Sequence, residues 1–370
     1  MPDALIVVWN DGQSARFPAL WLRDCRTEDR DPHSGQRLID IADLPDEPRI
    51  RSARTANGGL ELEFEGEPSA CHYAAGWLRE HALAASERRP ELRTNLWLNG
   101  AERDARREHA WLDYASLMAT PANRLSWLIR LAQDGIAFVA GVPSRAGAIL
   151  EACAQMGRVA ETNYGLLFEV RSVARPENLA YSDHGLGLHT DNPYREPVPG
   201  FQALHVLVSS PDGGESLFAD GLAIAAHLRS TEPAAFAVLT STPVPFQYRS
   251  ADADLYAERP LIQLSADGKV SAVHYNNRSI APLPPASAAF AAFYPAYRRF
   301  ARLLREPRFQ LRRRLADGEL VVFDNQRTLH GRTAFSSQRH PRHLQGCYLT
   351  RDSVYSEIGL LRRRMGENRQ

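Results

Sequence analysis

Residues 318–330 read GELVVFDNQRTLH and predict a buried strand, a polar turn and a return strand that carries His330. A second histidine stands far upstream in His189-Thr190-Asp191, the only HxD or HxE motif in the chain. Alternate residues of a strand point to the same face, so the side chains of His189 and Asp191 are expected to lie together. His330 must reach them from a different strand.

Two imidazoles and one carboxylate can cover one face of an octahedral iron(II) ion and leave three positions open for chemistry. Arg342, twelve residues after His330, adds a cation suited to the distal carboxylate of 2-oxoglutarate. In a chain with twelve histidines about one HxD pair arises by chance, so the motif alone is weak. Its coincidence with His330 and Arg342 favours an iron-dependent oxygenase. A hydrolase using zinc-bound water at the same trio is disfavoured by the extra arginine.

Short strand candidates separated by Asp-Gly turns, with few long helices between them, favour an antiparallel sandwich or barrel. A double-stranded β-helix (jelly roll) would bring opposed strands to one mouth, where the three ligands could meet. Further strands are expected at 135–139, 201–210, 214–221 and 261–275. Helices are expected at 114–118, 125–133 and 287–305.

Residues 1–95 predict a small β-rich domain, with strand candidates at 5–9, 14–22 and 60–66 and a helix at 74–84. The polar stretch 95–107 is the expected linker. Residues 96–370 then form the jelly-roll domain. The predicted fold class is therefore mainly β with helices (α+β).

Composition excludes several classes of function. Lys+Arg and Asp+Glu both number 44, so no net charge favours nucleic acid or anionic lipid. Lys269 is the only lysine, which leaves Schiff-base catalysis almost without a candidate. Four scattered cysteines fit a reducing cytoplasm. No signal peptide and no membrane span are expected.

An ordered set of motifs resembles the γ-butyrobetaine hydroxylase family of iron(II)/2-oxoglutarate dioxygenases. The motifs run over nearly the whole chain: WLRD (21–24), SGQR (34–37), WLREH (77–81), Tyr164-Gly165, NLAY (178–181), HTDNPY (189–194), GGESLFADG (213–221), YNN (275–277), LHGR (329–332) and RHLQGCY (342–348). The resemblance implies a jelly-roll catalytic domain, a small N-terminal domain and a homodimer.

The same resemblance implies roles for matching residues. His189, Asp191 and His330 would ligate iron, and Arg342 would pair with the distal carboxylate of 2-oxoglutarate. Ser216, in GGES, would add a hydrogen bond to the cosubstrate. Oxygen is the second cosubstrate, and ascorbate is the expected reductant.

An aromatic cage for a trimethylammonium group is implied at Tyr164, Phe168, Tyr181 and Tyr348. A quaternary ammonium has no hydrogen to donate, and each ring face contributes about 0.5–2 kcal/mol through cation–π attraction. Phe168 departs from the family, because tryptophan is familiar there in the animal enzyme. Its weaker face is expected to lower affinity or change the preferred head group.

The acidic end of the substrate is expected at Asn178 and at Asn276 or Asn277, with Arg278 beside them. A carboxylate needs little more than amide donors, whereas a phosphonate dianion gains more from an arginine. The sequence therefore leaves two substrates open, γ-butyrobetaine and 2-(trimethylammonio)ethylphosphonate, which a close relative hydroxylates. Hydroxylation is expected on a backbone carbon. A trimethyllysine or other amino-acid substrate, and a catalytically silent jelly-roll binder of quaternary ammonium, remain alternatives.

The N-terminal domain departs from the family at its zinc site. Between residues 21 and 37 Cys25 is the only cysteine, although His72 matches the family histidine. One cysteine and one histidine do not make the closed four-ligand site that zinc requires, so structural zinc is not expected. Candidates for further ligands are Cys71, Asp29, Asp31 and His33. Packing and ion pairs are the alternative means of holding this domain.

Overall fold

The computed structural model describes residues 3–82, 92–98, 111–171, 183–285, 288–336 and 342–367. The chain divides into two compact units, Met1–Glu91 and Leu92–Gln370. Residues 95–98, predicted to begin a linker, belong to the second unit and are anchored in it by Trp97. Trp97 is buried, its indole donates to the Asp134 carbonyl at 2.7 Å, and its backbone N–H donates to Asp220 at 3.1 Å. The rest of the predicted linker lies mainly outside the described residues.

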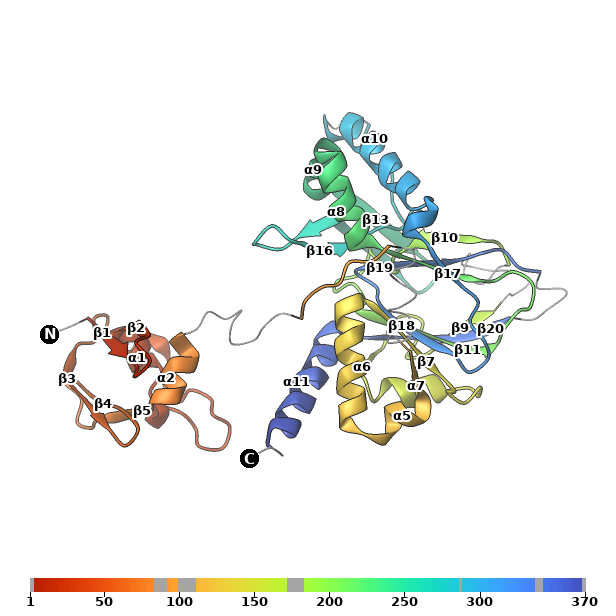
Figure 1. Ribbon diagram of the computed structural model, residues 1–370. Helices are drawn as coiled ribbons and strands as arrows, with labels where there is room; N and C mark the ends of the chain where they lie inside the picture. The colour runs from red at the N-terminus through yellow and green to blue at the C-terminus, as the bar shows by residue number, and fades with distance from the viewer. Residues whose placement is uncertain are drawn as a thin grey trace. The chain divides into compact units, whose positions relative to one another are not determined.

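The first unit contains two small antiparallel sheets and short helices (Figure 1). Its elements are β1 (Ala4–Val8), β2 (Ser14–Pro18), α1 (Ala19–Asp24), η1 (Thr27–Asp29), η2 (Ile41–Asp43), β3 (Ile50–Ala56), β4 (Gly59–Phe64), β5 (Cys71–Ala74) and α2 (Ala75–Ala82). The prediction of one strand over residues 14–22 is wrong in its second half. Pro18 ends β2 and precedes α1, which turns Leu22 into the same core as Phe17.

The second unit is built on two facing sheets. The larger has the order β6-β7-β18-β11-β20-β8, with β9 also paired to β20, and the smaller has the order β10-β19-β12-β17. Their bounds are β6 (Trp111–Asp113), β7 (Ile136–Ala140), β8 (Val159–Ala160), β9 (Phe168–Arg171), β10 (Leu186–His189), β11 (Phe201–Val208), β12 (Ser216–Asp220), β17 (Leu311–Arg313), β18 (Leu320–Asp324), β19 (Thr328–Arg332) and β20 (His343–Leu349). This arrangement confirms the predicted jelly roll.

Strand β18 of the larger sheet is buried on both of its faces. Val321 and Phe323 pack into the core between the sheets, whereas Leu320 and Val322 pack into the core beneath the helices. A strand with apolar residues at every position is typical of a sheet covered on both sides. The run LVVF was therefore a reliable sequence signal.

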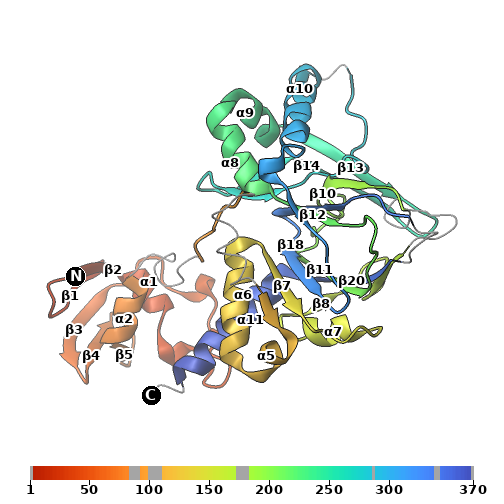
Figure 2. The same ribbon diagram turned by 45° about the vertical axis from the view of Figure 1, so that its right-hand side comes forward.

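Helices cover the second unit in two groups (Figures 1 and 2). One group packs on the outer face of the larger sheet: α5 (Tyr114–Ala119), α6 (Pro121–Asp134), α7 (Ala148–Cys153) and α11 (Arg351–Glu367). The other group consists of α8 (Gly221–Thr231), α9 (Pro233–Ser241) and α10 (Ala288–Leu303). These helices share a core with two hairpins and the single turn η4 (Pro307–Phe309). The hairpins are formed by β13 (Pro243–Arg249) with β14 (Asp254–Pro260) and by β15 (Ile262–Leu264) with β16 (Val270–Val273). Among the described helices none has the length and apolarity needed to cross a bilayer.

Candidate metal centre and its cavity

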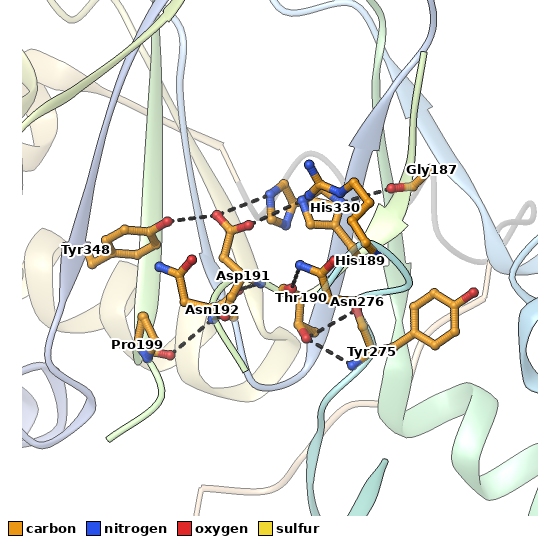
Figure 3. A network of polar contacts seen from close by, with 12 residues as sticks. Gly187, His189, Thr190, Asp191, Asn192, Pro199, Tyr275, Asn276, His330 and Tyr348 are labelled. Atoms are coloured by element: carbon orange, nitrogen blue, oxygen red, sulfur yellow. Dashed lines mark hydrogen bonds and ion pairs between the residues drawn. The ribbon is translucent and has the colours of Figure 1, made fainter. Parts of the chain in front are cut away.

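The three side chains expected to bind a metal come together where β10 meets β19 (Figure 3). His189 pairs in register with His330, and Asp191 follows in the turn after β10. One ligand atom from each residue lies within 4.8 Å of the others. His189 Nε2 is 3.2 Å from Asp191 Oδ1, and His330 Nε2 is 3.8 Å from Oδ2. The described residues contain no other such group of histidine, cysteine and acidic side chains.

Neighbouring groups orient the trio. The Gly187 carbonyl lies 2.8 Å from His189 Nδ1, which assigns the proton to Nδ1 and leaves the Nε2 lone pair for a metal. The Asn325 side chain bonds both the N–H and the carbonyl of Asp191, at 2.7 and 3.0 Å. The Tyr348 hydroxyl donates to Asp191 Oδ2 at 2.8 Å. His330 Nδ1 is buried without a partner, an orphaned polar atom beside the other two ligands.

The electrostatics of the trio fit a cation. Burial, followed by repulsion from His189, lowers the pKa of His330 to about 3. Burial and then Arg278 lower the pKa of His189. Burial alone would raise the pKa of Asp191, but His330, His189 and Arg278 outweigh it and hold that pKa far below its usual value. At neutral pH the site is two neutral imidazoles and a carboxylate, the state in which these groups bind iron(II).

The trio opens into a cavity between the two sheets with about 780 Å³ of empty space, its open mouth included. Its walls combine aromatic, aliphatic and cationic side chains. The lining residues are Tyr164, Phe168, Val170, Leu186, His189, Asp191, Asn192, Gln202, Leu204, Ser216, Phe218, Arg278, His330, Gly331, Arg332, Arg342, Leu344 and Tyr348. Asp191 is the only acidic residue among them, so the described wall has an excess of positive charge.

Three arginines supply that excess. Arg342 makes no hydrogen bond or ion pair with any described residue, and burial followed by repulsion from Arg332 lowers its pKa to about 10. Its side chain passes Gly214, where an added Cβ would lie 2.9 Å from Arg342 Cδ. Burial and then Arg278 lower the pKa of Arg332 to about 10, with Asp183 acting in the opposite direction.

Aromatic rings form a second wall. The rings of Phe168 and Tyr348 are 5.2 Å apart, and those of Tyr164 and Phe168 are 6.4 Å apart, edge to face. Phe168 lies opposite Gly346 in the β9–β20 pair, where a Cβ would come within 2.4 Å of its ring. The absence of a side chain at Gly346 therefore allows the Phe168 ring to lie against the strand. Behind this wall Tyr248 packs 6.2 Å from Tyr164.

Of the remaining predicted site residues, one lines the cavity, two lie outside its described lining, and two lie outside the described residues. Ser216 lines the cavity on β12, opposite Arg332 in register. Asn276 and Asn277 do not belong to the described lining. The Asn276 amide donates to the Thr190 carbonyl at 3.0 Å, and Asn277 Oδ1 accepts the Tyr297 hydroxyl at 2.7 Å. The other two predicted substrate contacts, Asn178 and Tyr181, lie outside the described residues.

Sequence reasoning did not single out Asn192, Gln202 or Arg332, all of which line the cavity. Arg332 lies two residues after His330 on β19, so its side chain points to the same face of the strand, and this spacing could have identified it. Gln202 is a polar residue in the apolar strand FQALHVLV and is 2% exposed, with an Oε1 that has no partner. Asn192 adopts a left-handed backbone at φ 53° directly after Asp191.

Residues 103–348 match the family model described as taurine catabolism dioxygenase TauD, TfdA family. Residues 2–102 match the model described as γ-butyrobetaine hydroxylase-like, N-terminal. Both matches agree with the resemblance found in the sequence motifs.

Two relatives span almost the whole chain. The γ-butyrobetaine dioxygenase of Pseudomonas sp. (strain AK-1) is 36% identical, over 96% of this chain and 93% of that relative. The trimethyllysine dioxygenase of Meyerozyma guilliermondii is 26% identical, over 97% and 94%. A solved asparagine oxygenase, in complex with Fe(II), 3-hydroxyasparagine and succinate, is similar in fold with a TM-score of 0.50. Its identity is 18%, and the match covers 70% of this chain and 94% of that one.

Proposed function

The chain belongs to the taurine catabolism dioxygenase TauD, TfdA family, and we propose that it hydroxylates a backbone carbon of a small trimethylammonium acid. It is an iron(II)/2-oxoglutarate-dependent dioxygenase. We propose γ-butyrobetaine as the first substrate to test, giving a carnitine-type product. Its phosphonate analogue, 2-(trimethylammonio)ethylphosphonate, is the second.

The residues of the cavity fit the iron and the cosubstrate. His189, Asp191 and His330 would hold iron(II), because two neutral imidazoles and an ionised carboxylate are its usual facial ligands. When bound, iron(II) with 2-oxoglutarate would supply the oxygen activation, with release of succinate and carbon dioxide, and ascorbate would keep the metal reduced. Arg342, which lines the cavity and makes no hydrogen bond or ion pair with a described residue, would pair with the distal carboxylate. Ser216 lines the same cavity and would add a hydrogen bond.

The aromatic wall carries the substrate proposal. Tyr348 contributes both a ring to this wall and a hydroxyl to Asp191, so a cation against the wall would be near the metal. Ring faces attract a quaternary ammonium without leaving any donor hydrogen unmet. Tyr181 is proposed as a further wall residue on the resemblance alone. Phe168 has a weaker face than tryptophan, which is expected to reduce affinity for the trimethylammonium group.

The acidic end of the substrate is proposed to face Arg278, which lines the cavity and whose charge lowers the pKa of His189. The Asn276 amide donates to the Thr190 carbonyl, Asn277 Oδ1 accepts from the Tyr297 hydroxyl, and neither residue belongs to the described lining of the cavity. Arg278 does line it, and an arginine there favours keeping the phosphonate as second candidate. Asn178 remains a proposed contact from the resemblance.

Positioning is the chain's main contribution to the reaction. A cation site and an anion site at the two ends of a short molecule hold one methylene near the metal, which favours hydroxylation on the backbone over an N-methyl group. A trimethyllysine substrate would need room for an α-amino group. A silent quaternary-ammonium binder would have no use for His189, Asp191, His330 and Arg342 together.

Succinate formation with iron(II), 2-oxoglutarate, ascorbate and oxygen tests the proposal. Each candidate acid is compared with its isostere in which carbon replaces the quaternary nitrogen. Stimulation by γ-butyrobetaine or its phosphonate analogue, but not by the isostere, is the expected result. Equal stimulation by acid and isostere would contradict the aromatic cation site. Retained iron with no stimulation by either acid would overturn the substrate class and leave the family assignment intact.

A further inference from the structure

Two arginines of the cavity lining, Arg332 and Arg342, lie on or directly beside strands of the two facing sheets. Residues of one parity on β19 face the cavity, so Arg332 points inward from the same strand as His330. Arg342 directly precedes β20 and shares the parity of Leu344 and Tyr348, which also line the cavity. The two guanidinium groups therefore approach one space from opposite sheets.

Both guanidinium groups lie close to one aromatic ring, that of Phe335. The guanidinium carbon of Arg332 lies 5.4 Å from the centroid of Phe335, and that of Arg342 lies 5.7 Å from it. One arm of Arg332 also donates to the His184 carbonyl at 3.4 Å. Ser216 lies beside Arg332, because it is the register partner of Arg332 on β12. Two cations near one ring in a partly desolvated space repel each other, and the Asp183 carboxylate, which acts on Arg332, does not belong to the described lining of the cavity.

We propose that Arg332 is a second cationic anchor for the distal carboxylate of 2-oxoglutarate, acting with Arg342 and Ser216. This inference rests on the proposed function, since it assigns a further contact to the same cosubstrate. A carboxylate offers about four lone-pair sites, of which the fork of one arginine fills two. Arg332 and Ser216 would supply the remaining donors. The spacing fits, because two residues of strand from His330 to Arg332 advance about 7 Å, comparable with a five-carbon dicarboxylate.

A specificity consequence follows. When a 2-oxo acid without a second carboxylate binds, the two guanidinium groups and the hydroxyl of this site have no anionic partner, which is unfavourable. The cavity should therefore discriminate 2-oxoglutarate from 2-oxopentanoate, which has the same carbon chain and the same chelating end. Arg332 should account for a measurable part of that discrimination.

The test is an anaerobic titration of the iron(II)-loaded protein, following the visible charge-transfer band of a chelated 2-oxo acid. The titration needs no turnover and no trimethylammonium substrate. Arg332→Gln is expected to weaken 2-oxoglutarate binding at least about tenfold and to leave 2-oxopentanoate binding almost unchanged. Arg332→Lys keeps the charge but loses the fork, and an intermediate weakening of about threefold is expected. Arg278→Gln is the control for the electrostatic field of the cavity, because it removes the same charge from a lining residue whose charge also acts on Arg332.

Three outcomes would overturn the inference. The first is unchanged 2-oxoglutarate affinity in both Arg332 variants. The second is equal weakening of the two 2-oxo acids, which indicates a general loss of structure. The third is an equal effect of Arg278→Gln, which indicates only a long-range field. If Arg332→Gln does not fold, Arg332→Lys decides the question alone. Failure of the unmodified protein to bind 2-oxoglutarate would instead overturn the proposed function.

Discussion

The Tyr348 hydroxyl lies 2.8 Å from Oδ2 of Asp191 and donates a hydrogen bond to it, although 157 residues separate the two in the chain. A ring of the aromatic wall is thereby fixed to a carboxylate of the candidate metal centre. Such outer hydrogen bonds orient metal ligands and typically contribute 10–100-fold to metal affinity, as an order of magnitude. The substrate wall and the metal centre therefore depend on one side chain.

Tyr348→Phe separates these two roles, because it keeps the ring and removes the hydroxyl. Iron(II) affinity is expected to fall roughly 10–100-fold, measured by anaerobic equilibrium dialysis. Tyr164→Phe is the control, since it also removes a hydroxyl from the wall, and Tyr164 is not among the main groups that act on the Asp191 carboxylate. An equal loss of iron in both variants would contradict the assigned role of the Tyr348 hydroxyl.

Gly214→Ala is expected to raise the KM for 2-oxoglutarate while iron stays bound. Gly214 has φ +64°, and an added Cβ would meet Arg342 Cδ at 2.9 Å, so the arginine must shift. Gly268→Ala is a matched control, because Gly268 has φ +77° but nothing within 4 Å of an added Cβ. Both variants should lose about 1–2 kcal/mol of stability through left-handed backbone strain. A rise in KM for 2-oxoglutarate in both would show that strain alone is responsible.

Gly346→Ala is expected to impair recognition of the trimethylammonium group. The new methyl group would come within 2.4 Å of the Phe168 ring and push it away from the wall. Steady-state kinetics should show a several-fold rise in the KM for the quaternary substrate, corresponding to about 1 kcal/mol of lost cation–π attraction. Gly359→Ala, on α11 with nothing within 4 Å, is the control. An unchanged KM in Gly346→Ala would remove Phe168 from the substrate site.

The metal-free protein is expected to lose stability as pH falls below about 6.5. The folded-state pKa of His330 is depressed to about 3, whereas an unfolded histidine titrates near 6.5. Between these values the unfolded state binds a proton that the folded state does not, so stability decreases by about 1.4 kcal/mol per pH unit for this group.

Comparison with His330→Leu isolates that contribution, because His274, whose pKa burial also lowers to about 3, titrates in the same range in both proteins. Urea unfolding at several pH values between 7 and 4 is the measurement. The variant should show a slope smaller by about one proton. Parallel slopes would mean that His330 is not held neutral by burial.

In the N-terminal unit, Glu67→Gln is expected to be strongly destabilising. Glu67 accepts from both Arg23 and Arg26, and Arg23 also pairs with Asp29. Arg23 and Arg26 are buried and Glu67 is half-buried, so removing the charge of their shared acceptor is expected to cost about 1.5–3 kcal/mol. Hydrogen exchange of the full chain should show faster exchange in β4 and β5, with no comparable change in Glu47→Gln, whose exposed side chain forms a looser 3.7 Å pair. Equal protection in the two variants would contradict a structural role for the cluster.

Local patterns in the sequence were sufficient to predict several features. The apolar run LVVF depends only on the period of a strand and agrees with the structure. His189 and Asp191 also meet as expected, at 3.2 Å, but β10 ends at His189, so the turn after the strand, and not strand alternation, places Asp191 there. The resemblance to the family is likewise confirmed by the family matches. The prediction failed at residues 19–22, where an apolar run after Pro18 continues as a helix. It failed again at Trp97, which the polar residues around it placed in a predicted linker but whose side chain is buried in the structure.

The sequence by itself determined which residues can bind a metal and which strands can form a two-sided core, because those properties follow from side-chain chemistry and a two-residue period. Only the tertiary structure decided which residues meet. The register of His189 with His330, the bond from Tyr348 to Asp191, and the approach of Arg332 and Arg342 to one ring all join distant segments. Such contacts leave no local signal, because they depend on how two sheets pack and on where glycines such as Gly214 and Gly346 leave space.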